Sequence, residues 1–228
     1  MILSLLTVNK IRLMTKINNM KTITESMNWR YATHKFDDVK IPSKERIMAL
    51  LDAARLSPSW YGLQPWKFIL VENKELRQKM QEAGYNQPKI SEAPYFVVFA
   101  SKTDYSETDV DAFLKSTAEA QGKTPEDLKG LKGGVMNFIN SRKNKLDEWS
   151  MNQTHIAFGV FIAAAAVSGI DAGPIGGFDS DKYDEILGLK ELGLHAAVVC
   201  ALGFRSENDE TSKRAKSRFS MEEVVIEK

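Results

Sequence analysis

The spacing of apolar residues along the chain predicts helices that alternate with strands. A helical spacing follows Ser43, with apolar residues at Ile47, Leu50, Leu51 and Ala54. Residues 95–100 and 196–202 are rich in β-branched and aromatic side chains and predict buried strands, and residues 67–71 predict a third. Short helices are expected over 75–83 and 181–187, because a glycine follows each. Residues 101–132 are polar and predict a partly helical surface excursion.

The longest predicted helix covers residues 147–168 and ends at Gly169. Its second half, residues 156–167, is apolar on every side, which is typical of a helix buried all round, at the centre of a domain or in a subunit interface. Residues 171–179 combine glycine and proline and predict a tight bend. Residues 224–226 favour a strand. The pattern indicates a mixed α and β domain, and the order of elements leaves parallel and antiparallel sheets open.

Composition narrows the class of protein. The chain has 228 residues and is 43% hydrophobic, which suits one globular domain. A net charge of +1 argues against a generally basic surface for nucleic acid. Cys200 is the single cysteine, so a disulfide framework within one chain is excluded and a reducing, cytoplasmic compartment is expected.

No apolar stretch is both long and pure enough to suggest a membrane span, since residues 156–167 are too few. The first ~20 residues have mixed character. They are either a flexible extension or an upstream start, with Met20 or Met27 as the true beginning. We therefore divide the chain into an extension, residues 1–26, and one domain, residues 27–228.

Metal and hydrolytic sites find little support in the sequence. His34, His155 and His195 are scattered, with no partner at metal-ligand spacing. Cys200 has no base near it in sequence, and no G-x-S-x-G or P-loop motif occurs. A core thiol and core histidines are the better interpretation.

Basic residues cluster near both ends of the chain. Arg30, His34 and Lys35 fall within eight residues, and Lys216 and Arg218 lie near the C-terminus. Arginine recognises phosphate through paired hydrogen bonds, so the two clusters predict a phosphate site if the fold brings them together. A glycine run at 173–177 allows close approach to a flat ligand, or is a plain turn. The aromatic loop 57–66 either covers a ligand or is ordinary packing.

Five segments taken together resemble the FMN-dependent nitroreductase family of the oxygen-insensitive NAD(P)H type. They are R-x-x-T-x-x-F-D at 30–37, S-P-S and Q-P-W within 57–66, Asn86 with Lys89, the run 174–179, and K-S-R at 216–218. The resemblance covers nearly all of the chain from about Met27 onward. It implies an α+β nitroreductase-like fold with a central, mainly antiparallel sheet flanked by helices. It also implies an intertwined homodimer whose two FMN sites each use both subunits.

The resemblance also implies roles for individual residues. Arg30, Lys216 and Arg218 would hold the flavin phosphate, with Tyr31 at the flavin tail. Asn86 and Lys89 would face the pyrimidine and N1–O2 edges of the ring. The glycine run would pack on the ring, and the loop at 58–60 would reach the partner's flavin. The full expected cofactor site is Arg30, Tyr31, Ala32, His34, Pro58, Ser59, Trp60, Asn86, Lys89, Pro174, Ile175, Gly176, Gly177, Lys216 and Arg218.

The chain departs from the family pattern at a few positions. His34 stands where a second lysine is common, and Ala32 where a serine helps to bind the phosphate. Gly176 replaces an acidic residue that some relatives carry. Trp60, Tyr61 and Gly62 replace smaller polar residues, so the pocket wall should be more aromatic.

The implied activity is reduction of nitroaromatics, quinones or similar small acceptors, with NADH or NADPH as donor, by a ping-pong hydride mechanism. No side chain is needed as nucleophile, so no catalytic residue and no metal are expected. Two alternatives stay open: a flavin-binding module for storage or sensing without turnover, and a same-fold enzyme with different flavin chemistry, such as flavin breakdown or dehalogenation.

Overall fold

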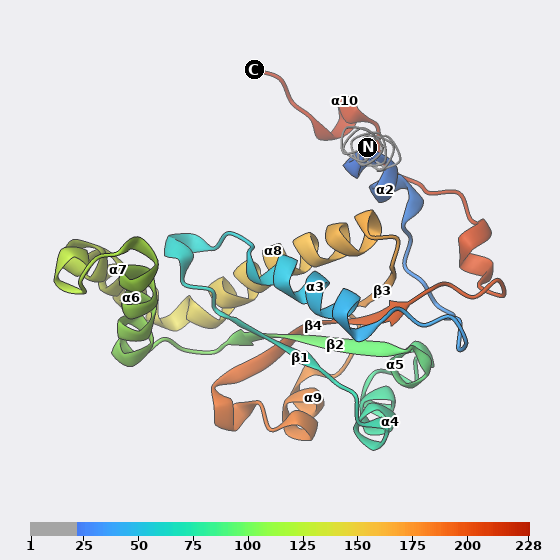
Figure 1. The fold of residues 1–228 in the computed structure, drawn as a ribbon, viewed down its shortest axis with the longest axis horizontal. Helices are drawn as coiled ribbons and strands as arrows, with labels where there is room; N and C mark the ends of the chain where they lie inside the picture. The colour runs from blue at the N-terminus through green and yellow to red at the C-terminus, as the bar shows by residue number, and fades with distance from the viewer. Residues whose placement is uncertain (1–21) are drawn as a thin grey trace, which may run out of the picture.

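The structure is a computed structural model that describes residues 22–228. Its helices and strands alternate along the chain, as the apolar spacing predicts (Figure 1). The elements are α2 Ile23–Trp29, α3 Lys44–Arg55, β1 Trp66–Leu70, α4 Lys74–Ala83, α5 Lys89–Glu92, β2 Tyr95–Lys102, α6 Glu107–Gln121, α7 Lys129–Ser141, α8 Leu146–Val167, β3 Asp171–Ile175, α9 Ser180–Leu187, β4 Leu194–Gly203 and α10 Met221–Val224, with short 3-10 turns between some of them.

One four-stranded sheet forms the centre, in the order β1-β2-β4-β3, and every neighbouring pair is antiparallel. This confirms the expected mainly antiparallel α+β fold. Side chains alternate between the two faces of β2. Phe96 and Val98 pack into one core, whereas Val97 and Phe99 pack into the other. Both faces of the central strands are therefore buried, which explains their continuous apolar sequence.

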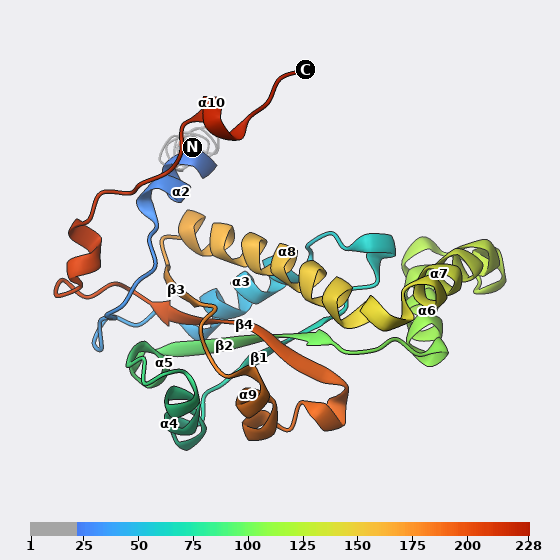
Figure 2. The same ribbon diagram turned by 180° about the vertical axis from the view of Figure 1, so that it is seen from behind.

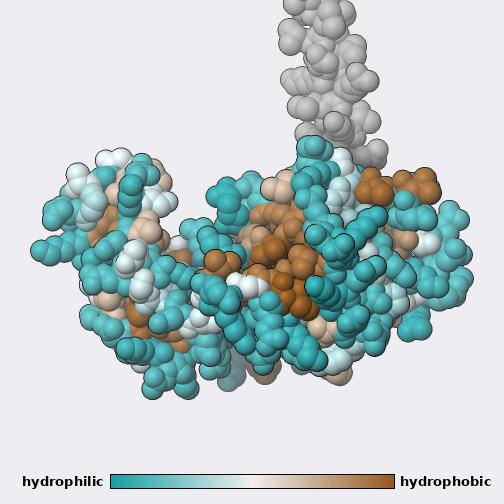
Figure 3. Space-filling view, turned by 90° about the horizontal axis from the view of Figure 1, so that it is seen from below, coloured by the Kyte–Doolittle hydropathy of each residue, from teal (hydrophilic) through white to brown (hydrophobic). Residues whose placement is uncertain are grey.

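Helices cover both faces of the sheet (Figures 1 and 2). The predicted apolar face of α3 packs with α8 over one side of the sheet, and residues from α4, α5 and α9 form the core on the other side. Seen from the side that carries α4 and α9, the surface is mostly hydrophilic, with apolar residues gathered near its centre (Figure 3). Helices α6 and α7 build a third core of their own, against the start of α8, and form a lobe at one end of the molecule.

Helix α8 is buried on one side only within the described chain, so of the two expected settings the centre of a domain does not apply, and the subunit interface stays a prediction. Phe161 and Ala165 are fully buried against the sheet, but the side chains of Ile156 and Val167 are 44% and 45% exposed. By length and composition the segment Lys143–Val167 also meets the criteria for a membrane-spanning helix, which the sequence analysis had not expected. Here the helix packs on α3 and on the sheet.

Two other expectations are wrong, and a third concerns residues outside the described range. Residues 171–175 form the edge strand β3 rather than a tight bend; Pro174 is tolerated there because an edge strand leaves one row of N–H groups unpaired. Residues 224–226 form no strand, and the turn of helix α10 ends at Val224. The expected N-terminal extension lies outside the described residues up to residue 21, and α2 begins at Ile23, before the proposed domain start.

Gly173 marks the closest approach between β3 and the chain's N-terminal segment. A Cβ atom there would lie 2.5 Å from the carbonyl oxygen of Thr33 and 3.5 Å from Cδ of Lys89. We expect Gly173→Ala to lower the free energy of unfolding by about 1–3 kcal/mol, because the backbone of Thr33 must move. Urea denaturation measures the change.

Gly130 in α7 provides the matched control, because a Cβ atom there meets nothing within 4 Å. Gly130→Ala should stabilise the helix by up to about 1 kcal/mol. Equal effects of the two substitutions would contradict the close packing inferred at Gly173.

Candidate functional site

The two ends of the described chain are joined beside the end of β4. Lys35 accepts a hydrogen bond from the amide of Ser206 (3.0 Å), and the amide of Asp37 donates to Phe204 (2.8 Å). Residue Phe36 forms an isolated antiparallel bridge with Arg205. These backbone contacts place the basic cluster that starts at Arg30 next to the tail that carries the second cluster.

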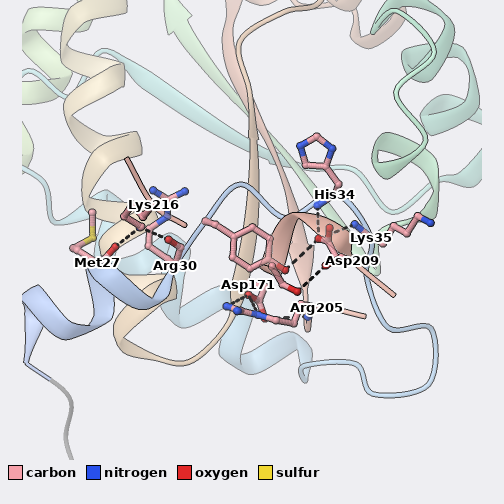
Figure 4. A network of polar contacts seen from close by, with 10 residues as sticks. Met27, Arg30, His34, Lys35, Asp171, Arg205, Asp209 and Lys216 are labelled. Atoms are coloured by element: carbon pink, nitrogen blue, oxygen red, sulfur yellow. Dashed lines mark hydrogen bonds and ion pairs between the residues drawn. The ribbon is translucent and has the colours of Figure 1, made fainter. Parts of the chain in front are cut away.

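The predicted phosphate residues do come together. Arg30, Lys216 and Arg218 line one pocket of about 300 Å³, whose other lining residues all belong to α2. The Lys216 ammonium donates to the carbonyl oxygens of Met27 (2.6 Å) and Arg30, so the tail is fixed against the C-terminal end of α2 (Figure 4). Arg30 follows α2 directly, and its amide caps the helix by donating to Ser26.

The charges in this pocket repel each other. Burial lowers the pKa of Arg30, and the charge of Arg218 lowers it further. Burial, followed by the charges of Arg30 and Arg218, lowers the pKa of Lys216. Among residues 22–228 none of the three forms an ion pair, and the buried Nε of Arg30 has no hydrogen-bond partner. Three cations with no carboxylate between them are suited to bind a multiply charged anion.

Asp209 fixes the geometry of the N-terminal segment, and the sequence analysis did not identify it. One carboxylate oxygen, Oδ2, accepts from the amides of His34 (2.8 Å) and Lys35 (3.2 Å) and from the hydroxyl of Tyr31 (3.2 Å) (Figure 4). The side chain of Asp209 is 1% exposed. Burial by itself raises its pKa, but the hydrogen bonds from the amides of His34, Lys35 and Thr211 outweigh that effect and hold the pKa below its ordinary value.

Arg205 forms a second set of contacts that holds the N-terminal segment. The guanidinium of Arg205 pairs with the buried carboxylate of Asp171 in β3 (2.6 Å and 2.7 Å). The same guanidinium lies 4.2 Å from the ring centre of Trp29 and 4.5 Å from that of Tyr31. The rings of Trp29 and Tyr31, on either side of Arg30, are thereby tied to the sheet. In the sequence, Asp209 could have been recognised only as an acidic residue of the type that starts a helical turn, and Arg205 and Asp171 carry no such signal.

His34 and Lys89 lie within electrostatic range of each other. Partial burial and then the charge of Lys89 lower the pKa of His34, which favours the uncharged imidazole. Burial lowers the pKa of Lys89, which is 7% exposed and forms no ion pair with any residue in the described range. Lys89 lies next to Gly173, and the carbonyl oxygen of Thr33, the residue before His34, approaches the same glycine.

The loop that holds Asn86 lies against the glycine run. Gln87, which the sequence analysis did not single out, donates through Nε2 to the carbonyl oxygens of Gly84 and Gly177, both at 2.9 Å. Asn86 has φ of +56°, a conformation that asparagine tolerates better than most residues. Beside Gly176 and Gly177 a Cβ atom would meet nothing within 4 Å, so this side of the region is open.

One predicted segment lies far from the others in the chain's own fold. Pro58, Ser59 and Trp60 lie at the start of α8, where the amide of Trp60 donates to Oε1 of Gln153 (3.0 Å). The pocket at Arg30 lies at the opposite end, beside α2 (Figures 1 and 2). Helix α8 has 22 residues and therefore a length of roughly 33 Å. One protomer does not bring these residues together.

Two other reactive groups have structural roles. Burial raises the pKa of the Cys200 thiol to about 12, which makes it a core residue rather than a nucleophile. Asp181, Asp184 and His195 lie close enough to hold a metal ion, which the scattered histidines of the sequence did not suggest. Asp184 already accepts from His195 (2.6 Å) and from the amide of Ala196 (2.8 Å), so the pair joins α9 to β4.

Comparison with known proteins gives consistent matches. The model of the nitroreductase family matches residues 27–204. A Bacillus subtilis protein named "Putative NAD(P)H nitroreductase YfkO" is 33% identical over 222 residues, 91% of this chain and 98% of that protein. A Staphylococcus saprophyticus protein named "Putative NAD(P)H nitroreductase SSP0379" is 32% identical over 214 residues, 90% and 96% of the two chains.

Solved structures share the fold. The crystal structure of a Bacillus subtilis protein described as "putative nitroreductase ydfN" has a TM-score of 0.79 at 17% identity, covering 90% of this chain and 98% of that one. An Exiguobacterium sibiricum protein, described as a "putative nitroreductase in complex with FMN", has a TM-score of 0.75 at 18% identity, covering 91% and 98%.

The three hydrogen bonds to Oδ2 make Asp209 a testable anchor. Asp209→Asn should lower the free energy of unfolding by about 1–3 kcal/mol at pH 7. Both carboxylate oxygens accept hydrogen bonds, and an asparagine amide has only one oxygen to accept them. A carboxylate with a lowered folded pKa stabilises the fold above its unfolded pKa of roughly 3.9, and this contribution is lost as pH falls through the folded value. The difference from wild type should therefore shrink below about pH 4.

Thermal or urea unfolding at several pH values measures this difference. Asp38→Asn is the control, since Asp38 is an exposed aspartate in the same N-terminal segment as His34 and Lys35. A loss from Asp209→Asn that is no larger than the control's would show that Asp209 is not an anchor.

Proposed function

Because the chain belongs to the nitroreductase family, we propose that it is an FMN-dependent NAD(P)H oxidoreductase that reduces nitroaromatics, quinones or similar electron-poor acceptors. The observation that carries the proposal is the pocket that Arg30, Lys216 and Arg218 share without a carboxylate. Relatives named as NAD(P)H nitroreductases and a fold neighbour described in complex with FMN support the same activity.

The residues present fit FMN. The unpartnered Nε of Arg30, with Lys216 and Arg218, would hold the phosphate, and Tyr31 would lie beside it. The departure at Ala32 removes a hydroxyl, and the three cations still supply the charge that a phosphate requires. The Asp209 anchor would keep the segment that carries these contacts in place before the cofactor arrives.

The region of His34 and Lys89 fits the isoalloxazine ring. Open space beside Gly176 and Gly177 leaves room for a flat group, and Asn86 lies on the loop that Gln87 ties to Gly177. When bound, FMN supplies the capacity to take a hydride from NAD(P)H and to pass electrons to an acceptor. Lys89 would stabilise negative charge at the ring edge, and neutral His34 would donate a hydrogen bond there.

We also propose that each complete site forms in a homodimer. Pro58, Ser59 and Trp60 lie beside the first half of α8, where Trp60 bonds to Gln153, and the pocket of Arg30 lies near the other end of the helix, beside α2. Two copies of α8 that pair around a twofold axis through their exposed sides, which carry Ile156 and Val167, would place the start of one helix near the end of the other. The aromatic loop of one protomer would then lie near the flavin of its partner.

The activity is tested with the FMN-loaded protein under anaerobic conditions. NADPH or NADH should bleach the flavin absorbance, and a nitroaromatic or a quinone should restore it. FMN that is retained but not bleached would favour a storage or sensing module. A protein that cannot be loaded with FMN would contradict the proposal.

The phosphate assignment is tested by cofactor affinity in the same preparation. Arg30→Ala and Arg218→Ala should each weaken FMN binding by about 10- to 100-fold, the usual value of a charged hydrogen bond, and leave riboflavin binding nearly unchanged. Lys35→Ala is the control, because Lys35 is an exposed cation in the same segment. Equal losses at Lys35 and Arg30, measured by fluorescence titration, would refute the assignment.

Mixed dimers test the composite site. A dimer of one Arg30→Ala protomer and one Trp60→Ala protomer contains one fully wild-type site if each site uses both chains, and none if each site lies within a chain. We expect about half of the wild-type turnover per dimer. A mixed dimer of Arg30→Ala with the Arg30→Ala/Trp60→Ala double variant is the control, since Arg30 is then missing from both sites. Turnover no higher than this control would contradict a shared site.

A further inference from the structure

The loop at the start of α8 displays an aromatic surface to solvent. Trp60 is 53% exposed and Tyr61 is 44% exposed. Trp60 stacks on Phe138 of α7, with ring centres 5.6 Å apart and planes 16° from parallel. Tyr61 meets the same Phe138 ring edge-on at 6.0 Å. Phe138 is itself buried, so it supports the two exposed rings from below.

The backbone holds these rings in place at some energetic cost. Tyr61 has φ of +56° and Gln64 has φ of +47°, in the left-handed region that side-chain-bearing residues rarely occupy. Two such residues within one short loop store strain, and strain of this kind gathers at binding sites. Hydrogen bonds from the amide of Trp60 to Gln153 (3.0 Å) and from the amide of Gln64 to Ser59 (2.9 Å) hold the loop in this shape.

A cation lies next to the aromatic surface. The guanidinium of Arg142, at the end of α7, is 4.7 Å from the ring centre of Phe138 and 5.9 Å from that of Trp60. Within residues 22–228 its guanidinium joins no ion pair, and no hydrogen bond is formed by its side chain. An arginine whose face contacts aromatic rings still has its N–H edges free to bind an anion.

We propose that Trp60, Tyr61 and Arg142 bind flat aromatic acceptors that carry an anionic group, such as a sulfonate or a carboxylate. The acceptor's ring stacks on the exposed face of Trp60, and its anionic group accepts hydrogen bonds from the Arg142 guanidinium. This inference rests on the proposed function, because the dimer is what brings the loop near a flavin. It assigns acceptor selectivity to Arg142, outside the cofactor site.

Binding of an acceptor-like probe that the flavin does not reduce tests the recognition directly. The FMN-loaded protein is titrated with naphthalene-2-sulfonate and with 2-naphthol by calorimetry. The sulfonate should bind at least about fivefold more tightly, and Arg142→Gln should remove this preference without weakening 2-naphthol. Trp60→Ala should weaken both probes. Lys143→Gln, which removes the neighbouring exposed charge, is the matched control and should leave the preference intact.

Reoxidation gives a second readout that does not involve the nicotinamide donor. After reduction of the bound FMN with dithionite, Arg142→Gln should slow reoxidation by 1,2-naphthoquinone-4-sulfonate at low concentration by about fivefold or more and leave 1,2-naphthoquinone unaffected. The inference would be overturned if the wild type bound the sulfonate and the naphthol with equal affinity. It would also be overturned if Arg142→Gln and Lys143→Gln weakened sulfonate binding equally. If NAD(P)H still bleaches the flavin in that case, the proposed function stands; if FMN cannot be loaded, both fall.

Discussion

A carboxylate oxygen of Asp209 holds the first residues of the described chain against its C-terminal tail. Oδ2 of Asp209 accepts from two successive amides, those of His34 and Lys35, and from the Tyr31 hydroxyl. Without that acceptor, three donors in a nearly closed space would lose their partner. The pocket around Arg30 depends on the same contact, because Lys216 follows Asp209 by only seven residues and reaches the carbonyl oxygens beside α2. Attraction at the anchor thus offsets the repulsion among the cations that form the pocket.

The sequence predicts the chemistry of the site better than its supports. The basic clusters and the resemblance to the nitroreductase family together predicted that Arg30, Lys216 and Arg218 meet, and the three do line one pocket. Asp209 and Arg205 could not be predicted, since their roles arise only where β4 runs beside the N-terminal segment. A carboxylate in a polar tail has the same appearance in sequence whether it is solvated or holds three donors.

Local signals also explain the errors in secondary structure. Glycine and proline in residues 173–177 indicate a bend, but pairing with β4 holds the first part of this run as a strand whose Pro174 needs no partner. The apolar sequence of α8 was read correctly as a helix; the described chain covers the side that faces the sheet and α3, and cover of the other side by a second chain stays a prediction. The continuous apolar runs of β2 and β4 and the helical spacing of α3 were predicted well because the same chain covers both faces of those strands and the apolar face of that helix.

The length of α8 also limits how this protein can change. The helix lies between the aromatic loop and the pocket of Arg30, so under the proposed pairing it sets the distance between groups that must meet across two chains. One inserted residue would shift one end by about 1.5 Å and turn it by roughly 100°, at both sites of a symmetric dimer at once. Substitutions along this helix are therefore far better tolerated than insertions or deletions. The α6–α7 lobe has a core of its own and lies outside this constraint only where it does not support the aromatic loop through Phe138.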